Sequence, residues 1–178
     1  GDFSVSECPI YSLNNTGDIC PPGTYCPEGS QYPTPCPKGQ FCEGYANEIY
    51  DGPCTAGFFC NGSASVTDPV PCSKGHYCPQ GTEVEEPCEP GTYSDREQNT
   101  NISYCLSCTP GMYCEEWGME IPSGECARGY FCPGGQDALR PVDLACSPGH
   151  FCEEGSWNQT GCPSGWYQQH WGRYDCNL

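Results

Sequence analysis

A seven-residue unit with the pattern Cys-x-x-Gly-x-(Tyr/Phe)-Cys recurs along almost the whole chain. Its nine opening cysteines lie 16 to 20 residues apart, and we number the units 1 to 9 from Cys20, Cys36, Cys54, Cys72, Cys88, Cys108, Cys126, Cys146 and Cys162. Units 5 and 9 have Ser94 and Gln168 where the others have a closing cysteine. A repeat this short cannot bury its aromatic side chain alone, so neighbouring copies must stack into a linear array.

The residues inside the unit predict a tight turn. Proline or a small residue often precedes the glycine, which supplies a backbone angle that other residues avoid. We expect the aromatic ring to pack over a disulfide and over the next unit's turn. The chain contains 23 glycines and 19 prolines, and it lacks sustained helical periodicity of apolar residues, so little or no helix is expected. The predicted fold is a small disulfide-rich, elongated rod of about nine short β-hairpin or turn repeats, with a lead-in over 1–19 and the array over 20–178.

The composition requires covalent cross-links. Leu, Ile, Val and Phe together make up only 21 of 178 residues, and the net charge is −17. A chain below about 20% in these residues and highly charged cannot bury enough apolar surface to fold without other support. The 19 cysteines supply that support and predict an extracellular protein, secreted or at the cell surface. The lack of a long apolar run argues against direct membrane insertion, and six basic residues argue against nucleic-acid binding. Because the sequence starts without a signal peptide, we read it as a mature or partial secreted chain.

Two pairing schemes are open for the cysteines, because a later cysteine follows each unit that lacks its closing one. Pairing within units joins Cys20–Cys26, Cys36–Cys42, Cys54–Cys60, Cys72–Cys78, Cys88–Cys105, Cys108–Cys114, Cys126–Cys132, Cys146–Cys152 and Cys162–Cys176, and leaves Cys8 over. Pairing across units joins Cys8–Cys20, Cys26–Cys36, Cys42–Cys54, Cys60–Cys72, Cys78–Cys88, Cys105–Cys108, Cys114–Cys126, Cys132–Cys146 and Cys152–Cys162, and leaves Cys176 over. The spacing of Cys8 and Cys20 favours the second scheme, whereas a bridge across two residues disfavours it. The leftover cysteine indicates a piece of a longer repeat protein, an intermolecular bond or a free thiol.

One segment carries a family likeness. Cys88-Glu-Pro-Gly-Thr-Tyr-Ser-Asp95, followed by Cys105-Leu-Ser-Cys108, resembles the ephrin-receptor-like cysteine-rich repeat. Units that keep the closing cysteine resemble a variant found in surface and mastigoneme (flagellar hair) proteins of protists and algae. The resemblance covers about residues 20–176 and implies an extracellular rod without catalytic residues. It also implies the pairing of Cys88 with Cys105, and we therefore prefer the within-unit scheme.

Four glycosylation sequons lie between the turn units, at Asn14, Asn61, Asn101 and Asn158. Their placement predicts glycans that project from an exposed rod, and we expect at least two sites to be occupied. The aromatic-rich C-terminal region (Trp157, Trp166, Tyr167, Trp171 and Tyr174) is predicted to be a terminal cap or local packing, with a contact surface as the alternative.

Other groups have structural explanations. Cys105-Leu-Ser-Cys108 lacks a second Cys-x-x-Cys and is not expected to bind metal. His76 and His150 occupy a position that accepts many residue types, so we expect them to be exposed. The acidic clusters at Glu115-Glu116, Glu153-Glu154 and Glu83 to Glu86 indicate a solvated face rather than a Ca²⁺ site. No cofactor and no enzymatic activity are expected.

The leading hypothesis from sequence is a structural extracellular glycoprotein that builds a filament, a surface coat or a flagellar hair. Its predicted partners are copies of itself or neighbouring repeats of a longer chain. The alternative hypothesis is a stalk or ectodomain segment of a cell-surface receptor or adhesion protein. A small secreted inhibitor or toxin is a weaker idea, because nine repeats exceed what such domains need.

Overall fold

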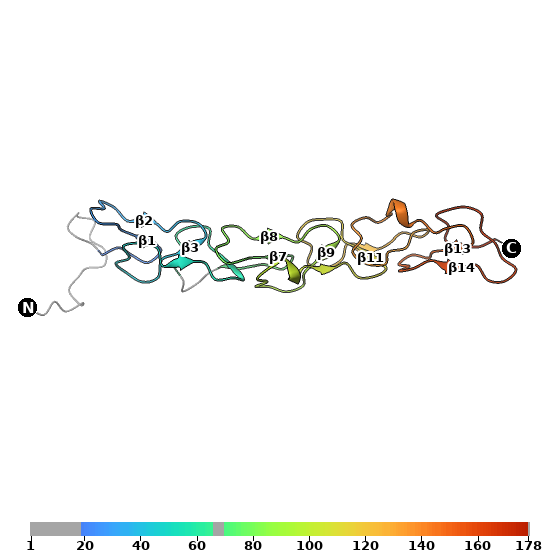
Figure 1. Ribbon diagram of the computed structural model, residues 1–178, viewed down its shortest axis with the longest axis horizontal. Helices are drawn as coiled ribbons and strands as arrows, with labels where there is room; N and C mark the ends of the chain where they lie inside the picture. The colour runs from blue at the N-terminus through green and yellow to red at the C-terminus, as the bar shows by residue number, and fades with distance from the viewer. Residues whose placement is uncertain (1–18, 66–69, 178) are drawn as a thin grey trace, which may run out of the picture.

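The protein is an elongated rod in which the units follow one another along the axis in sequence order (Figure 1). The computed structural model describes residues 19–65 and 70–177. Within those residues the regular structure consists of short antiparallel hairpins and two 3-10 turns, without an α-helix. The predicted fold, a disulfide-rich array of turn and hairpin repeats, is confirmed.

Each hairpin links the aromatic end of one unit to the residues just before the next opening cysteine. The paired strands are β1 (Thr24–Tyr25) with β2 (Thr34–Pro35), β3 (Gln40–Phe41) with β4 (Gly52–Pro53), β5 (Phe58–Phe59) with β6 (Val70–Pro71), β7 (His76–Tyr77) with β8 (Glu86–Pro87), β9 (Thr92–Tyr93) with β10 (Leu106–Ser107), β11 (Met112–Tyr113) with β12 (Gly124–Glu125), and β13 (His150–Phe151) with β14 (Thr160–Gly161). Units 7 and 9 make single bridges instead, Tyr130 to Ala145 and Tyr167 to Asn177. The 3-10 turns are η2 (Ile102–Tyr104) and η3 (Val142–Leu144).

All the units share a β-turn whose hydrogen bond is donated by the N–H of the residue after the glycine. In unit 1 the Thr24 N–H donates to the Pro21 carbonyl at 3.2 Å, and Gly23 has φ +78°. A positive φ at the third turn position defines a type II turn, and glycine adopts it without strain. The same hydrogen bond recurs in all nine units. The turn predicted from the Cys-x-x-Gly spacing is therefore present in each of them.

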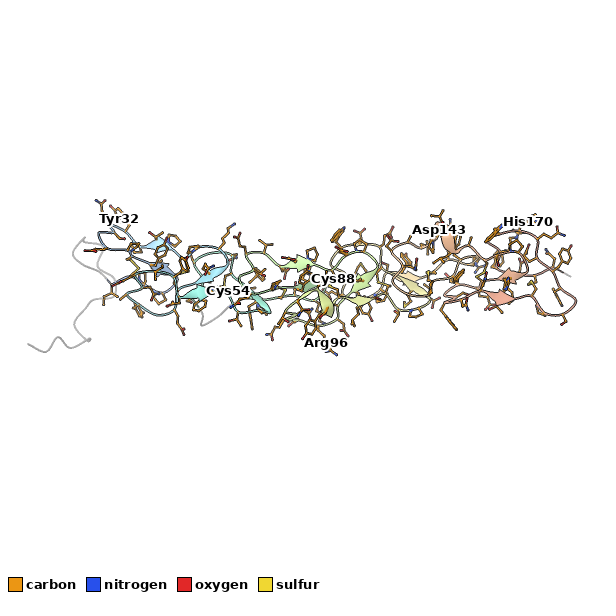
Figure 2. The ribbon with its side chains drawn as sticks, viewed as in Figure 1. Tyr32, Cys54, Cys88, Arg96, Asp143 and His170 are labelled. Carbon is orange, nitrogen blue, oxygen red and sulfur yellow. A yellow bond between two sulfur atoms is a disulfide. The ribbon has the colours of Figure 1, made fainter. Side chains whose placement is uncertain are left out.

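Nine disulfides follow one another along the rod, and fourteen of their cysteines are buried; two of these, Cys54 and Cys88, are labelled in Figure 2. They join Cys20–Cys26, Cys36–Cys42, Cys54–Cys60, Cys72–Cys78, Cys88–Cys105, Cys108–Cys114, Cys126–Cys132, Cys146–Cys152 and Cys162–Cys176. These are the pairs of the within-unit scheme. Cys105 is bonded to Cys88 and Cys108 to Cys114, so the Cys105–Cys108 bridge of the other scheme does not form. Cys8 lies outside the described residues.

The buried core is made of cysteine. All the buried hydrophobic residues are half-cystines, fourteen in number among the described residues. The motif aromatic rings are only half-buried in units 1 to 8. The rings of Phe41 and Tyr113 lie against Gly52 and Gly124, their partners across the hairpin. The aromatic side chains therefore flank the core, and the sulfur atoms fill it.

Consecutive units are joined by the same four backbone hydrogen bonds at all eight junctions. The glycine N–H of one unit donates to the carbonyl at the closing position of the next, and the glycine carbonyl accepts from the next opening cysteine. The other two bonds involve the linking loop, which we define as the residues just after the closing position. Between units 3 and 4 the bonds are Gly57 N–H to Cys78 C=O, Cys72 N–H to Gly57 C=O, Cys60 N–H to Thr82 C=O and Gly81 N–H to Cys54 C=O, at 2.8 to 3.0 Å.

Each unit also touches the unit two places further on. One residue of each linking loop has φ between 55° and 83°; these loop residues are Gly29, Ala46, Ser63, Gly81, Gln98, Gly118, Gly135, Gly155 and Gly172. In units 2 to 9 its N–H donates to the carbonyl of the preceding unit's opening cysteine. Its carbonyl rests on the motif glycine two units earlier. A Cβ on Gly75 would lie 2.0 Å from the Gly118 oxygen, and the corresponding distances for units 1 to 7 do not exceed 2.7 Å. The motif therefore requires glycine for this close approach as well as for the turn.

Candidate functional site

Three of the four predicted sequons lie on the described surface. Asn61, Asn101 and Asn158 are all exposed, together with the hydroxyl residue two places after each. The Asn101 side chain caps η2 by accepting a hydrogen bond from the Ser103 N–H at 2.9 Å. Asn14 lies outside the described residues. The three described sites are thus available on the outside of the rod, as the prediction requires.

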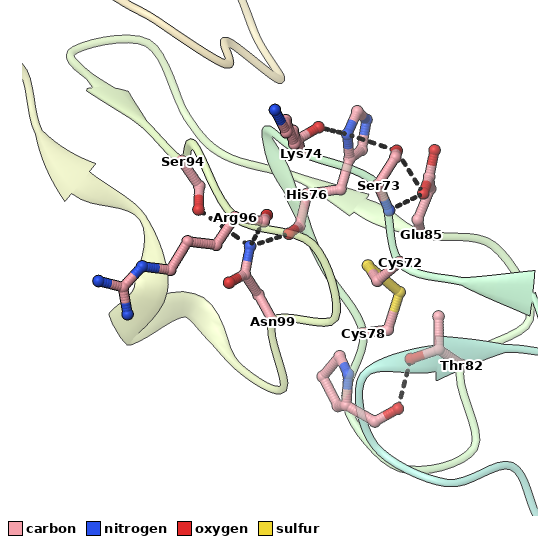
Figure 3. The surroundings of a disulfide bond; sticks show 11 residues. Cys72, Ser73, Lys74, His76, Cys78, Thr82, Glu85, Ser94, Arg96 and Asn99 are labelled. Atoms are coloured by element: carbon pink, nitrogen blue, oxygen red, sulfur yellow. Dashed lines mark hydrogen bonds between the residues drawn. A yellow bond between two sulfur atoms is a disulfide. The ribbon is translucent and has the colours of Figure 1, made fainter.

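Unit 5 carries a buried polar cluster that sequence reasoning missed. Ser94, which replaces the closing cysteine, is 1% exposed, and Asn99 in the following loop is 2% exposed. The Asn99 Nδ2 lies 2.8 Å from the His76 carbonyl oxygen, 2.9 Å from Ser94 Oγ and 2.9 Å from the Arg96 carbonyl oxygen (Figure 3). Ser94 cannot close a bridge, and the Cys88 disulfide runs to Cys105 instead. The sequence signal was the missing cysteine itself, because a polar residue at a buried position needs a partner.

Two units share a serine–histidine pair that superficially suggests catalysis. The Ser73 hydroxyl donates to Glu85 Oε2 at 2.7 Å and lies 3.5 Å from His76 Nδ1 (Figure 3). In a catalytic triad the carboxylate instead orients the histidine, and the histidine accepts the proton of the serine. Here the carboxylate holds the serine, and the Ser73 N–H also donates to it at 2.9 Å.

Unit 8 repeats this arrangement with a neutral residue. The Ser147 hydroxyl and N–H donate to Gln159 Oε1 at 2.8 and 3.1 Å. An amide oxygen serves the same geometric purpose as a carboxylate, so the shared role of Glu85 and Gln159 is to cap the turn. His76 and His150 are half-buried rather than exposed, which corrects the prediction. The loop of a later unit covers the first of them, since the His76 ring lies beside Gly118.

The acidic clusters do not converge. Within residues 19–65 and 70–177, no group of three or more His, Cys, Asp or Glu side chains is placed to hold a metal ion. Glu115, Glu116, Glu153 and Glu154 are all exposed. Cys105 and Cys108 are both in disulfides, so neither is available as a thiolate ligand.

The C-terminal aromatic residues are spread over an exposed surface. All five are more than 40% exposed, and Trp171 reaches 66%. Tyr174 of this group lies under the Arg128 guanidinium, 5.1 Å from the ring centroid, and Arg128 also lies 3.9 Å from Glu154. Together with Glu153 these residues line a hollow that spans units 7, 8 and 9. Such an exposed cation–π contact ties neighbouring loops together.

Comparison with known proteins assigns no function, so the functional argument rests on the fold and its surface. No family model matches the chain, and no curated protein matches it. In the part of the chain that the structure describes, no helix has the length and apolar character needed to span a membrane. The density of disulfides suits an extracellular structural protein.

Proposed function

We propose that this protein is a glycosylated extracellular rod that builds a filament, a surface coat or a flagellar hair. The observation that carries the proposal is the unbroken series of eight identical junctions, which keeps one geometry from unit 1 to unit 9. Such a series of repeated junctions sets the length and the direction of the rod. The resemblance of residues 88–108 to ephrin-receptor-like repeats supports the same class of protein.

The expected mechanical behaviour follows from the short cross-links. Seven of the nine disulfides join residues only six apart in sequence. A pulling force therefore cannot open these short loops, and the segments between them are held by the junction hydrogen bonds. The net charge of −17 and the glycans at exposed sequons oppose side-by-side clumping of rods. The proposed rod is thus stiff, resistant to extension and soluble.

Electron microscopy of the native material tests this proposal. We expect periodic fibres whose long axis follows the rod. Isolated rods that hold a separate domain away from a membrane would contradict the filament and favour the receptor or adhesion stalk.

The glycan component has its own test. Mass spectrometry before and after glycosidase treatment should show a loss of mass, with occupancy at two or more of Asn14, Asn61, Asn101 and Asn158. Asn→Gln variants at the three described sites assign the losses one by one, and Asn47→Gln, outside any sequon, is the control. An unchanged mass of the native protein would contradict glycosylation.

A further inference from the structure

The sequon at Asn101 lies within an exposed apolar segment in the middle of the rod. We define the unit 5 patch as Ile102, Tyr104 and Leu106, which are 54%, 41% and 48% exposed. Unit 5 has two neighbouring units on either side, and its junctions are complete, so this exposure does not come from a missing neighbour. Large apolar side chains that are exposed together commonly mark a contact surface.

The backbone holds the unit 5 patch in place. The Tyr104 N–H donates to the Asn101 carbonyl at 3.2 Å, and the Cys105 N–H donates to the Ile102 carbonyl at 2.9 Å. The disulfide from Cys105 to Cys88 and the pairing of β10 with β9 fix the chain that follows this turn. Neither a hydrogen bond nor a ring contact ties the Tyr104 side chain to another described residue. The Tyr104 ring is therefore presented to the outside by a fixed turn.

The direction of the Asn101 amide is fixed as well. Its Oδ1 accepts a hydrogen bond from the Ser103 N–H at 2.9 Å and another from the Ser103 hydroxyl. The amide nitrogen, to which a glycan would be attached, lies 3.2 Å from Thr100 Oγ1 on an exposed residue. Residues three apart face the same side of a 3-10 turn. A sugar on Asn101 therefore starts beside the Tyr104 ring.

We propose that the first sugar of an N-linked glycan on Asn101 packs over the Tyr104 ring, with Ile102 and Leu106 at the edge of the contact. The inference rests on the glycosylation included in the proposed function, and it names the place where that glycan binds. A pyranose ring has a face of C–H groups and a rim of hydroxyl groups. Stacking this face on an aromatic ring buries apolar surface of both partners and leaves the hydroxyl groups in water.

A tethered sugar fits this patch better than a second protein does. A stable protein interface has about 20 residues on each side, whereas the patch has three. A glycan is bulky, so one attached at Asn101 would hold another protein surface away. Because the sugar is covalently attached, its effective concentration at the ring is high, and a small contact is enough to keep it there. The covered patch no longer favours side-by-side clumping of rods.

The sequon at Asn61 supplies the matched comparison. Among the described residues between Tyr50 and Val70, none is an exposed large apolar residue. The loop at Asn61 is anchored by the Ser63 N–H, which donates to the Cys36 carbonyl at 3.0 Å. A sugar on Asn61 therefore has no comparable surface on which to pack, and the Ser63 amide reports what a glycan does without such a contact.

NMR spectroscopy and hydrogen exchange of the secreted 178-residue chain test the contact. The glycans are trimmed enzymatically to one sugar on each asparagine, and the same chain produced without glycosylation is the reference. Disulfide mapping checks that both forms contain the nine native bridges. Tyr104→Ser removes the ring at an exposed position and leaves the Asn101 sequon intact, and it is measured in both forms.

We expect nuclear Overhauser contacts between the first sugar on Asn101 and the Tyr104 ring. The Tyr104 and Cys105 amides should exchange about threefold to tenfold more slowly when the sugar is present, because the contact stabilises the turn against local opening. Tyr104→Ser should abolish this gain. The Ser63 amide should change by less than about twofold on glycosylation of Asn61, since no aromatic ring is covered there.

A gain in protection that survives Tyr104→Ser, or an equal gain at Ser63, would overturn the proposal and show a general effect of glycosylation. An Asn101 without a glycan would also overturn it. A glycan on Asn101 that makes no contact with the ring would overturn this inference and leave the proposed function standing. The expected contact, found in a protein whose native material contains only isolated rods, would do the reverse.

Discussion

Units 1 to 7 and units 8 and 9 share the Cys-x-x-Gly-x-aromatic pattern and have very different surroundings. Each forms the turn and contains an opening cysteine in a disulfide, which are local properties of the sequence. The motif glycine, however, is buried only where a loop two units later covers it. The comparison teaches that the shape of a unit is local, whereas its burial comes from its neighbours and its second neighbours.

The largest expected effect comes from adding one methyl group at an inner and at an outer glycine. Gly75→Ala places a Cβ 2.0 Å from the Gly118 oxygen, so the loop of unit 6 must move. We expect a loss of stability above about 4 kcal/mol and failure to form the native disulfides. Gly149→Ala has the same left-handed strain without a neighbour and should cost only about 1–2 kcal/mol. Disulfide mapping and denaturant unfolding of both variants measure the difference.

Equal effects of these two substitutions would break the comparison. They would show that the turn alone determines the need for glycine, and that second neighbours contribute nothing.

Removing one disulfide from the middle of the rod should affect more units than removing one from its end. The Cys20–Cys26 and Cys54–Cys60 bridges close loops of the same length, each contributing about 2.4 kcal/mol in the chain-entropy estimate. Replacing Cys54 and Cys60 by alanine should expose amides in units 1 to 5, because unit 3 has neighbours on both sides. The same change at Cys20 and Cys26 should be felt only in units 1 to 3. Hydrogen exchange followed by mass spectrometry measures how many units lose amide protection in each variant. Identical exchange patterns in the two variants would contradict the expected difference.

The buried amide of unit 5 offers a smaller and more local test. Asn99 and Asn47 occupy the same loop position, but Asn47 makes a single side-chain hydrogen bond, to the Glu43 carbonyl. Asn99→Ala leaves buried polar groups without their partner and should cost about 1–3 kcal/mol. Asn47→Ala, the matched control, should cost less than about 1 kcal/mol. A ranking in the opposite order from denaturant unfolding would show that the cluster around Ser94 is not stabilising.

The smallest effect concerns ionisation at one inner hairpin. A hydrogen bond with the Glu86 carboxylate, its partner across the strands, raises the pKa of Tyr77 above 10.0, and burial adds to the shift. The native state therefore holds this proton more tightly than the unfolded chain does. The resulting stability is intact below pH 10 and is lost as the pH rises through the raised pKa. Glu86→Gln should lower the Tyr77 pKa in an NMR titration, and an unchanged value would exclude the carboxylate as its cause.

Much of the fold could be predicted because the strongest constraints are local. The spacing of Cys20, Gly23 and Cys26 indicates a turn and a short cross-link without reference to the rest of the chain, and their repetition implies a rod. The contact between a motif glycine and a loop 40 or so residues later could not be found this way. A faint signal exists, since six of the nine linking loops have glycine at their left-handed position, but Ala46, Ser63 and Gln98 interrupt it.

The surface was harder to predict than the backbone. Variation at the position of His76 and His150 suggested exposure, yet this position is half-buried in units 1 to 8 whichever side chain occupies it. At His76 the cover comes from a later loop, at Gly118. The Asn99 cluster was missed because an asparagine in a polar loop looks like any other until the fold closes over it. The exposed sequons, in contrast, needed only the knowledge that linking segments lie on the outside of a rod.

The central claim is that disulfide cross-links, aided by the repeated junctions, stabilise this fold in place of the buried apolar side chains that stabilise other proteins. Amide exchange at the junction donors, read before and after full reduction and alkylation without denaturant, tests this claim most directly. We predict that the N–H groups of Gly39, Gly57, Gly75, Gly91 and Gly111 are protected in the oxidised protein and exchange at unfolded rates once the thiols are blocked. Protection that survives reduction would show that hydrogen bonds and aromatic packing suffice, and would contradict the account.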